Sequence, residues 1–207
     1  MKNSATFYVV RHGKTVWNHK GLVQGHKDSH LTSEGEDQAH TLRKELSDVH
    51  FDLAFSSDLL RAKRTAEIIA LEKKLAITAT ELLRERSFGK YEGKHYSALS
   101  EFDKLCETLD EGMKYSYKYE DIESDEEMLT RFITFLRETA ITHPGKTILI
   151  VTHGNMMYEF LIKVGFGTHK SFPIDAIGNT AYFVMESDGV EFEIGKTSRI
   201  THPKPLK

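Results

Sequence analysis

Residues 8–13 read YVVRHG and residues 150–155 read IVTHGN. In each stretch, a short run with the apolar, β-branched composition of a buried strand leads into His-Gly. Similar runs at residues 51–55 and 77–80 predict two more strands. Ligands of open α/β sheets bind outside the carboxyl ends of the strands. We therefore expect His12 and His153 to lie at one edge of a common sheet.

Helical patterns alternate with these strands. Ser33-x-x-Glu36 and Ser124-x-x-Glu127 have the spacing of a capping box, and each precedes apolar residues at helical intervals. Further helices are predicted over residues 59–71 and 155–164, and a final hairpin over 181–194. The alternation predicts an α/β fold with three layers, in which helices cover both faces of a mostly parallel sheet. The hairpin is expected to add an antiparallel edge.

Composition limits the classes of function. The chain has 207 residues, with 28 Lys+Arg against 31 Asp+Glu, so it lacks the basic excess of a nucleic-acid-binding protein. Its single cysteine, Cys106, excludes an internal disulfide, as is usual in a reducing compartment. No signal peptide is visible, and no run approaches the ~20 apolar residues of a membrane span. We expect one cytoplasmic domain, 1–207, without a membrane or nucleic-acid partner.

One segment departs from the alternation of strands and helices. Residues 94–123, called the lid segment below, contain the tyrosine-rich run KYSYKY at 114–119 and one predicted helix near 99–109. The segment is predicted to be an inserted lid. The alternative, a solvated excursion whose tyrosines pack on the domain, remains open at this stage.

The residue types at the expected sheet edge favour phosphate chemistry. Arg11 precedes His12. Arg61 is predicted in the first turn of the helix that follows the strand at 51–55, and Glu85 follows the run at 77–80. Arginine presents a rigid, permanently charged fork that matches phosphate oxygens. A histidine kept neutral by neighbouring cations can attack phosphorus, and a carboxylic acid can protonate the leaving oxygen. These residues predict phosphoryl transfer without a metal ion.

Four segments together resemble the histidine phosphatase superfamily, the phosphoglycerate mutase-like group. They are residues 9–18 (VVRHGKTVWN), 55–62 (FSSDLLRA), 83–89 (LRERSFG) and 151–155 (VTHGN), and the resemblance covers nearly the whole chain. It implies that His12 is the phosphorylated histidine and that Glu85 is the proton donor. Arg11, Arg61 and His153 would bind and polarise the phosphoryl group.

The resemblance also implies a set of residues around the phosphate or substrate: Asn18, Gln24, Gly25, Phe88, Gly154 and Asn155. Two positions depart from the family's pattern. Lys14 stands where the family usually has glutamate, and we expect it to point to solvent. His30 stands where the family usually has proline.

The leading hypothesis is a metal-independent phosphatase that hydrolyses a small phosphorylated metabolite through a phosphohistidine, without a cofactor. The alternative is a cofactor-dependent phosphoglycerate mutase, although the lid segment is shorter than the insertion that the resemblance implies for mutases. A catalytically silent module that binds phosphorylated ligands is a third hypothesis. None of the other histidines has the spacing of a metal site. The substrate and the oligomeric state are not predicted.

Overall fold

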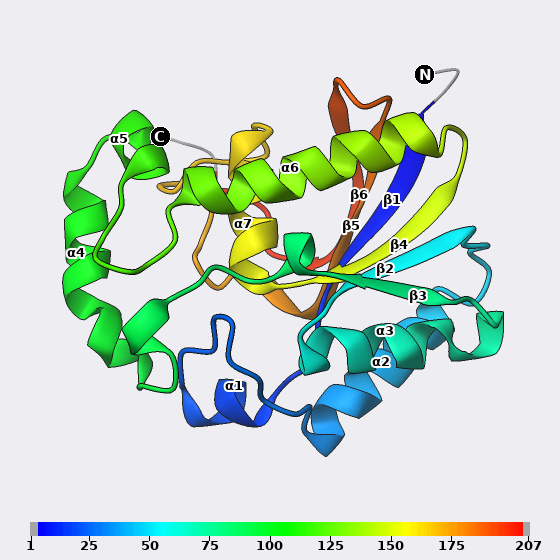
Figure 1. The fold of residues 1–207 in the computed structure, drawn as a ribbon, viewed down its shortest axis with the longest axis horizontal. Coiled ribbons are helices and arrows are strands. Elements are labelled where there is room, and N and C mark those ends of the chain that lie inside the picture. Colours follow the sequence, from blue (N-terminus) through cyan, green and yellow to red (C-terminus); the bar gives the residue numbers. More distant parts are fainter. Residues whose placement is uncertain (1–3, 205–207) are drawn as a thin grey trace.

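A computed structural model describes residues 4–204 and contains one six-stranded sheet, in the order β3-β2-β4-β1-β5-β6 (Figure 1). The strands are β1 (Ala5–Arg11), β2 (Leu53–Ser57), β3 (Ile77–Thr80), β4 (Thr147–Thr152), β5 (Ile177–Ser187) and β6 (Phe192–Ile200). The first four run parallel, while β5 pairs antiparallel with both β1 and β6. This confirms the predicted sheet and its antiparallel hairpin.

Helices cover both faces of the sheet, which confirms the three-layer α/β fold. The α-helices are α1 (Val16–Lys20), α2 (Ser33–Glu45), α3 (Leu60–Ala70), α4 (Ser100–Thr108), α5 (Glu111–Ser116), α6 (Asp125–Thr142) and α7 (Gly154–Lys163). Figure 1 shows α6 and α7 on one side of the sheet and α2 and α3 on the other. Within residues 4–204, no helix has both the length and the apolar character needed to cross a membrane.

Each face of the sheet has its own apolar core. On one face, Met128, Phe132 and Leu136 of α6 pack with α7 and the sheet, and all three are fully buried. On the other face, residues of α2 and α3 such as Leu42 and Ile69 pack against the same strands. Burial of a side chain of this size contributes about 1.5–3 kcal/mol to folding. The two cores therefore fix the strands whose ends carry the histidines.

Helix capping agrees with the sequence at one helix and differs at another. Ser124 and Glu127 form the predicted capping box at the start of α6. At α2 the prediction was wrong, because the N-cap is Thr32, whose hydroxyl accepts a hydrogen bond from the amide of Gly35. The residue three positions after this cap is a glycine, so it has no side chain to complete a box.

The lid segment lies beyond the carboxyl ends of the parallel strands (Figure 1). It contains the predicted helix, α4, and also α5, which the sequence analysis did not predict. Leu99 packs in a small apolar cluster with Val23, Phe88 and Ile122. Tyr115 of α5 packs against the apolar core formed by α6, α7 and the sheet. The Nζ of Lys163 lies 3.9 Å from the centroid of the Tyr115 ring. Whether the segment closes over a substrate remains a prediction.

Candidate active site

The register of β1 and β4 brings the two histidines together. Arg11 pairs with Thr152 in the parallel ladder, and the amide of the next residue, His12, donates to the Thr152 carbonyl at 3.0 Å. His153 follows Thr152 directly at the start of α7. Both imidazoles are buried, and their ring centroids lie 5.2 Å apart.

Hydrogen bonds fix which nitrogen of each histidine carries the proton. Nδ1 of His12 lies 2.8 Å from the carbonyl oxygen of Gly13, which can only accept, so Nδ1 donates. Nδ1 of His153 lies 3.2 Å from Nε of Arg61, which can only donate, so Nδ1 accepts. In the neutral rings, Nε2 of His12 therefore carries a lone pair, while Nε2 of His153 carries a hydrogen.

The surroundings keep both rings neutral. Burial lowers the pKa of His12 well below 6.5, and the charges of Arg61 and Arg11 lower it further. Burial and Arg61 likewise lower the pKa of His153 well below 6.5. At neutral pH the site thus presents an unprotonated nitrogen on one ring and an N–H on the other. The Nε2 of His153 is buried without a hydrogen-bond partner in the described part of the chain.

Arg61 lies in the first turn of α3 and is 1% exposed. Besides contacting His153, its guanidinium donates to the carbonyl oxygens of Lys27 at 2.8 Å and Gly25 at 2.7 Å. Burial lowers its pKa to about 10, so it stays charged at neutral pH. The Gly13 amide donates to Thr65 Oγ1, which donates to the Arg61 carbonyl, and this links the end of β1 to α3.

Arg11 is the last residue of β1 and directly precedes His12. Its Nη1 donates to the carbonyl of Ile177 in β5, and its buried Nε has no partner within residues 4–204. Burial lowers the pKa of Arg11, and the Glu85 carboxylate partly offsets this effect. A Cβ atom added to Gly154 would lie 3.1 Å from Cζ and Nε of Arg11. The guanidinium therefore rests against the first residue of α7.

Glu85 is buried and faces both arginines. Its Oε1 accepts hydrogen bonds from the amides of Arg86 at 2.9 Å and Met156 at 3.3 Å, and its Oε2 accepts from Asn155 at 3.2 Å. Two of these amides, those of Asn155 and Met156, belong to the first turn of α7. Because Oε2 accepts only this one bond in the described chain, it has room to carry a proton.

Asn18 and Gln24, which the family resemblance implied near the substrate, meet at Thr15. Thr15 is the N-cap of α1, and Oδ1 of Asn18 accepts from its amide at 3.1 Å. The Thr15 hydroxyl lies 2.9 Å from Oε1 of Gln24. Since both side-chain oxygens are used locally, the two amide NH₂ groups are the parts that can donate to a ligand.

The remaining residues implied by the resemblance have main-chain or packing contacts. Gly25, with φ +53°, supplies a carbonyl to Arg61, and Asn155 supplies its amide to Glu85. Gly154 packs against Arg11, and Phe88 lies in the apolar cluster that Leu99 and Ile122 of the lid segment help to form. Lys14 forms an ion pair with Glu34 at 2.8 Å.

Two residues that shape the site, Glu92 and Arg131, were not predicted from the sequence. Glu92 is buried, and its Oε1 accepts from the amides of His26 and Phe88, so it joins the loop around Gly25 to the loop after Glu85. Arg131, from α6, donates to the Glu85 carbonyl at 2.9 Å. The only sequence signal for Glu92 is its place between Gly89 and Gly93, two turn-forming residues.

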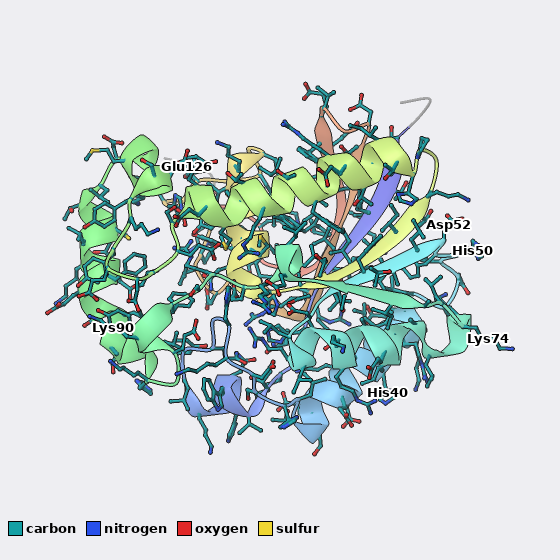
Figure 2. All side chains as sticks on the ribbon, viewed as in Figure 1. His40, His50, Asp52, Lys74, Lys90 and Glu126 are labelled. Carbon is teal, nitrogen blue, oxygen red and sulfur yellow. The ribbon has the colours of Figure 1, made fainter. Side chains whose placement is uncertain are left out.

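One group of side chains has the composition of a metal site. Ligand atoms of Asp125, Glu159 and His169 lie within 4.8 Å of one another. However, Nη2 of Arg86 already contacts both carboxylates, and His169 contacts Glu159 at 3.0 Å, so the group is a buried ion-pair cluster. Figure 2 shows His40 on α2 and His50 just before β2, and neither histidine belongs to this cluster.

Comparisons with known proteins show which family and fold this chain resembles. The model of the histidine phosphatase superfamily, branch 1, matches residues 7–198. A Hydrogenobacter thermophilus protein named "Putative phosphoserine phosphatase 2" is 31% identical over 202 residues, covering 96% of this chain and 98% of that protein. "Phosphoglycerate mutase-like protein 4" of Arabidopsis thaliana is 31% identical over 205 residues, covering 96% and 86%. The solved structure of Bacillus stearothermophilus YhfR is 29% identical, with a TM-score of 0.77 and coverage of 95% and 100%.

Proposed function

The chain belongs to the histidine phosphatase superfamily, and from this premise we propose that it is a metal-independent phosphatase of small phosphorylated metabolites. The observation that carries the proposal is the pair of complementary ring nitrogens. His12 offers an unprotonated Nε2, and the buried Nε2–H of His153 has no acceptor among residues 4–204. The centroids of the two rings lie 5.2 Å apart. A phosphoryl group between the rings would meet a nucleophile and a hydrogen-bond donor.

In the first step, Nε2 of His12 attacks phosphorus and forms an N–P bond while the bond from phosphorus to the ester oxygen breaks. Glu85, as the carboxylic acid, transfers its proton to the departing oxygen, which leaves as an alcohol. Arg11, Arg61 and the Nε2–H of His153 stabilise the charge on the phosphoryl oxygens. These groups supply the charge that a metal ion supplies in other phosphatases.

In the second step, water attacks the phosphohistidine. The Glu85 carboxylate takes a proton from the water as a P–O bond forms, and the N–P bond breaks. The products are inorganic phosphate and His12 with its lone pair restored, while Glu85 regains its proton. One carboxyl group thus serves as acid and then as base, as microscopic reversibility allows.

Trapping the intermediate tests this proposal. The protein is mixed with a radiolabelled phosphoester, quenched in denaturant, and divided between acid and alkali, because a phosphohistidine is lost in acid and survives in base. Label is expected on the wild type and on His50→Asn, a control at an exposed histidine, but not on His12→Asn. Base-labile label, or full activity in His12→Asn, would refute the mechanism.

The alternative reaction is that of a phosphoglycerate mutase, and it is considered because one relative is named as mutase-like. A mutase must shield its phosphoenzyme from water during turnover. Incubation with 3-phosphoglycerate, with and without 2,3-bisphosphoglycerate, separates the two reactions. We expect release of inorganic phosphate; isomerisation without net release would instead identify a mutase.

The proposal does not specify the alcohol that leaves, and therefore does not specify the substrate. The name of the Hydrogenobacter relative favours phosphoserine as a first substrate to assay. We propose a cytoplasmic location for the reaction, because small phosphorylated metabolites are found there and the chain has a single cysteine. A panel of phosphorylated metabolites, read by phosphate release and compared by kcat/KM, would rank the candidates.

A further inference from the structure

We infer that Arg131 is a positioning residue for Glu85, acting through the main chain of the loop that carries this carboxyl group. The inference rests on the proposed role of Glu85 as proton donor. Arg131 lies in α6, outside all four segments that resemble the family. It touches no group assigned to the phosphoryl site except the Glu85 carbonyl oxygen.

Arg131 donates three hydrogen bonds to the main chain around Glu85. Residues 84–88 have no regular secondary structure, and within residues 4–204 neither the Arg84 carbonyl nor the Glu85 carbonyl accepts a hydrogen bond from a main-chain amide. The Nη1 of Arg131 donates to the carbonyls of Leu82 at 3.0 Å and Arg84 at 2.6 Å, and its Nη2 donates to Glu85 at 2.9 Å. One planar guanidinium thus sets the relative positions of three carbonyl oxygens, including that of the acid itself.

A second ionised group holds this guanidinium in place. Glu123 accepts from Nε of Arg131 at 2.9 Å and from Nη2 at 3.0 Å. Glu123 also accepts from the Ser87 amide at 3.0 Å, and its own amide donates to the Ser87 carbonyl at 2.9 Å. The ion pair therefore contacts the loop on both sides of Glu85. Its side chains are only 17% and 15% exposed, so solvent screens the pair less than a surface salt bridge.

The Glu85 carbonyl also connects the acid to the phosphoryl-binding side of the site. It accepts a second hydrogen bond, at 2.9 Å, from Nε2 of His26. His26 lies between Gly25 and Lys27, the residues whose carbonyls bind Arg61. Arg131 approaches from α6 and His26 from the Arg61 loop, so together they set the distance between the proton donor and the arginine. A displacement of about 1 Å can reduce such catalysis on the order of 100-fold.

Two aryl phosphates of nearly equal shape test the inference. Phenol leaves less readily than p-nitrophenol, so phenyl phosphate depends more on the proton from Glu85. The proteins are wild type, Arg131→Met, Arg131→Lys, Glu85→Gln, the double variant Glu85→Gln/Arg131→Met, and Arg64→Met. Arg64 is a matched control, an arginine ion-paired at the surface of α3 with Glu36 at 2.8 Å. Thermal unfolding of each variant reports folding separately.

Arg131→Met is expected to lower kcat/KM for phenyl phosphate about tenfold more than for p-nitrophenyl phosphate. Arg131→Lys should lose less, and Arg64→Met should leave the ratio unchanged. In the Glu85→Gln background, removing Arg131 should cause no further selective loss. Equal losses on both substrates, or a selective loss that persists without Glu85, would overturn the inference. Should Arg131→Met fail to fold, Glu123→Gln is expected to shift the ratio in the same direction, and an unchanged ratio would overturn the inference.

The same set separates this inference from the proposed function. A selective loss in Glu85→Gln together with an unchanged ratio in Arg131→Met would refute the role of Arg131 alone. No selective loss in Glu85→Gln would refute the role of Glu85 as proton donor, and the inference with it.

Discussion

Nε of Arg61 donates a hydrogen bond to Nδ1 of His153 over 3.2 Å, within the buried centre of the site. Because arginine cannot accept, this contact places the proton of the neutral imidazole on Nε2. Arg61 therefore acts twice: its charge is available to an anion, and its Nε determines which nitrogen of His153 can donate to one.

Arg61→Lys is expected to lower kcat/KM for p-nitrophenyl phosphate by about 10²–10³-fold, as for the loss of one transition-state donor. An ammonium group keeps the charge but cannot reproduce the fork that reaches His153, Gly25 and Lys27 together. Initial rates measure the effect, with Arg64→Lys on the same helix as a control. A loss of less than tenfold would contradict the double role of Arg61.

The stability of the protein should fall as the pH drops below 6.5. The folded pKa of His12 lies well below 6.5, so the unfolded chain takes up a proton that the folded protein excludes. Between its folded pKa and 6.5, each such histidine makes the free energy of unfolding rise with pH by up to about 1.4 kcal/mol per pH unit. Above pH 6.5 this gain in stability is complete. Urea unfolding from pH 5 to 7.5 is the measurement.

His12→Gln should reduce the dependence of the free energy of unfolding on pH, because the contribution of one of the two buried histidines is lost. Asp125 changes stability in the opposite direction between its ordinary value of 3.8 and its folded pKa of about 6, to which burial raises it. This contribution is common to both proteins and cancels in the comparison. Identical slopes in wild type and His12→Gln would show that His12 is not held neutral by the fold.

Gly154→Ala should reduce activity while leaving the fold intact. The new methyl group would lie 3.1 Å from Cζ and Nε of Arg11, so the guanidinium must move by a few tenths of an ångström. We expect kcat/KM to fall about tenfold, with little change in the midpoint of thermal unfolding. Gly195→Ala, where the nearest atom is 3.6 Å away, is the control. Equal activities in the two variants would show that Arg11 has room to spare.

Chelation should not affect the reaction. Arg11, Arg61 and His153 supply the positive charge and donors of the proposed mechanism, and Arg86 already pairs with the carboxylates of Asp125 and Glu159. Dialysis against EDTA is therefore expected to leave kcat unchanged. A loss of activity that a divalent cation restores would instead assign a catalytic metal.

Much of the fold could be predicted from the sequence, because its strands are short apolar runs and its helices have regular apolar spacing. The convergence of His12 and His153 follows from the same pattern, since parallel strands carry both residues to one edge of the sheet. Local chemistry was less predictable. Ser33 and Thr32 are both good N-caps, and only the backbone of the folded chain determines that Thr32 caps α2.

The groups that hold the site together had no signature in the sequence. Arg61 is bound by the carbonyl oxygens of Gly25 and Lys27, and every residue type has such an oxygen. Arg131 reads as one of many charged residues on an amphipathic helix, and its contacts with a loop 46 to 49 residues away depend on tertiary packing. Similarly, the role of Glu92 as the acceptor for the amides of His26 and Phe88 is evident only when the two loops that carry them are folded side by side.

The use of main-chain oxygens to bind Arg61 has a consequence for how this protein can change during evolution. The Nζ of Lys27 donates to the Glu92 carbonyl at 3.0 Å, but the Lys27 carbonyl that binds Arg61 would remain after almost any substitution of this exposed residue. Gly25 lacks this freedom, because its φ of +53° and the adjacent Glu92 side chain exclude a Cβ atom. A substitution at position 27 would therefore keep this main-chain acceptor of Arg61, whereas a side chain at position 25 would displace the chain that supplies the other acceptor.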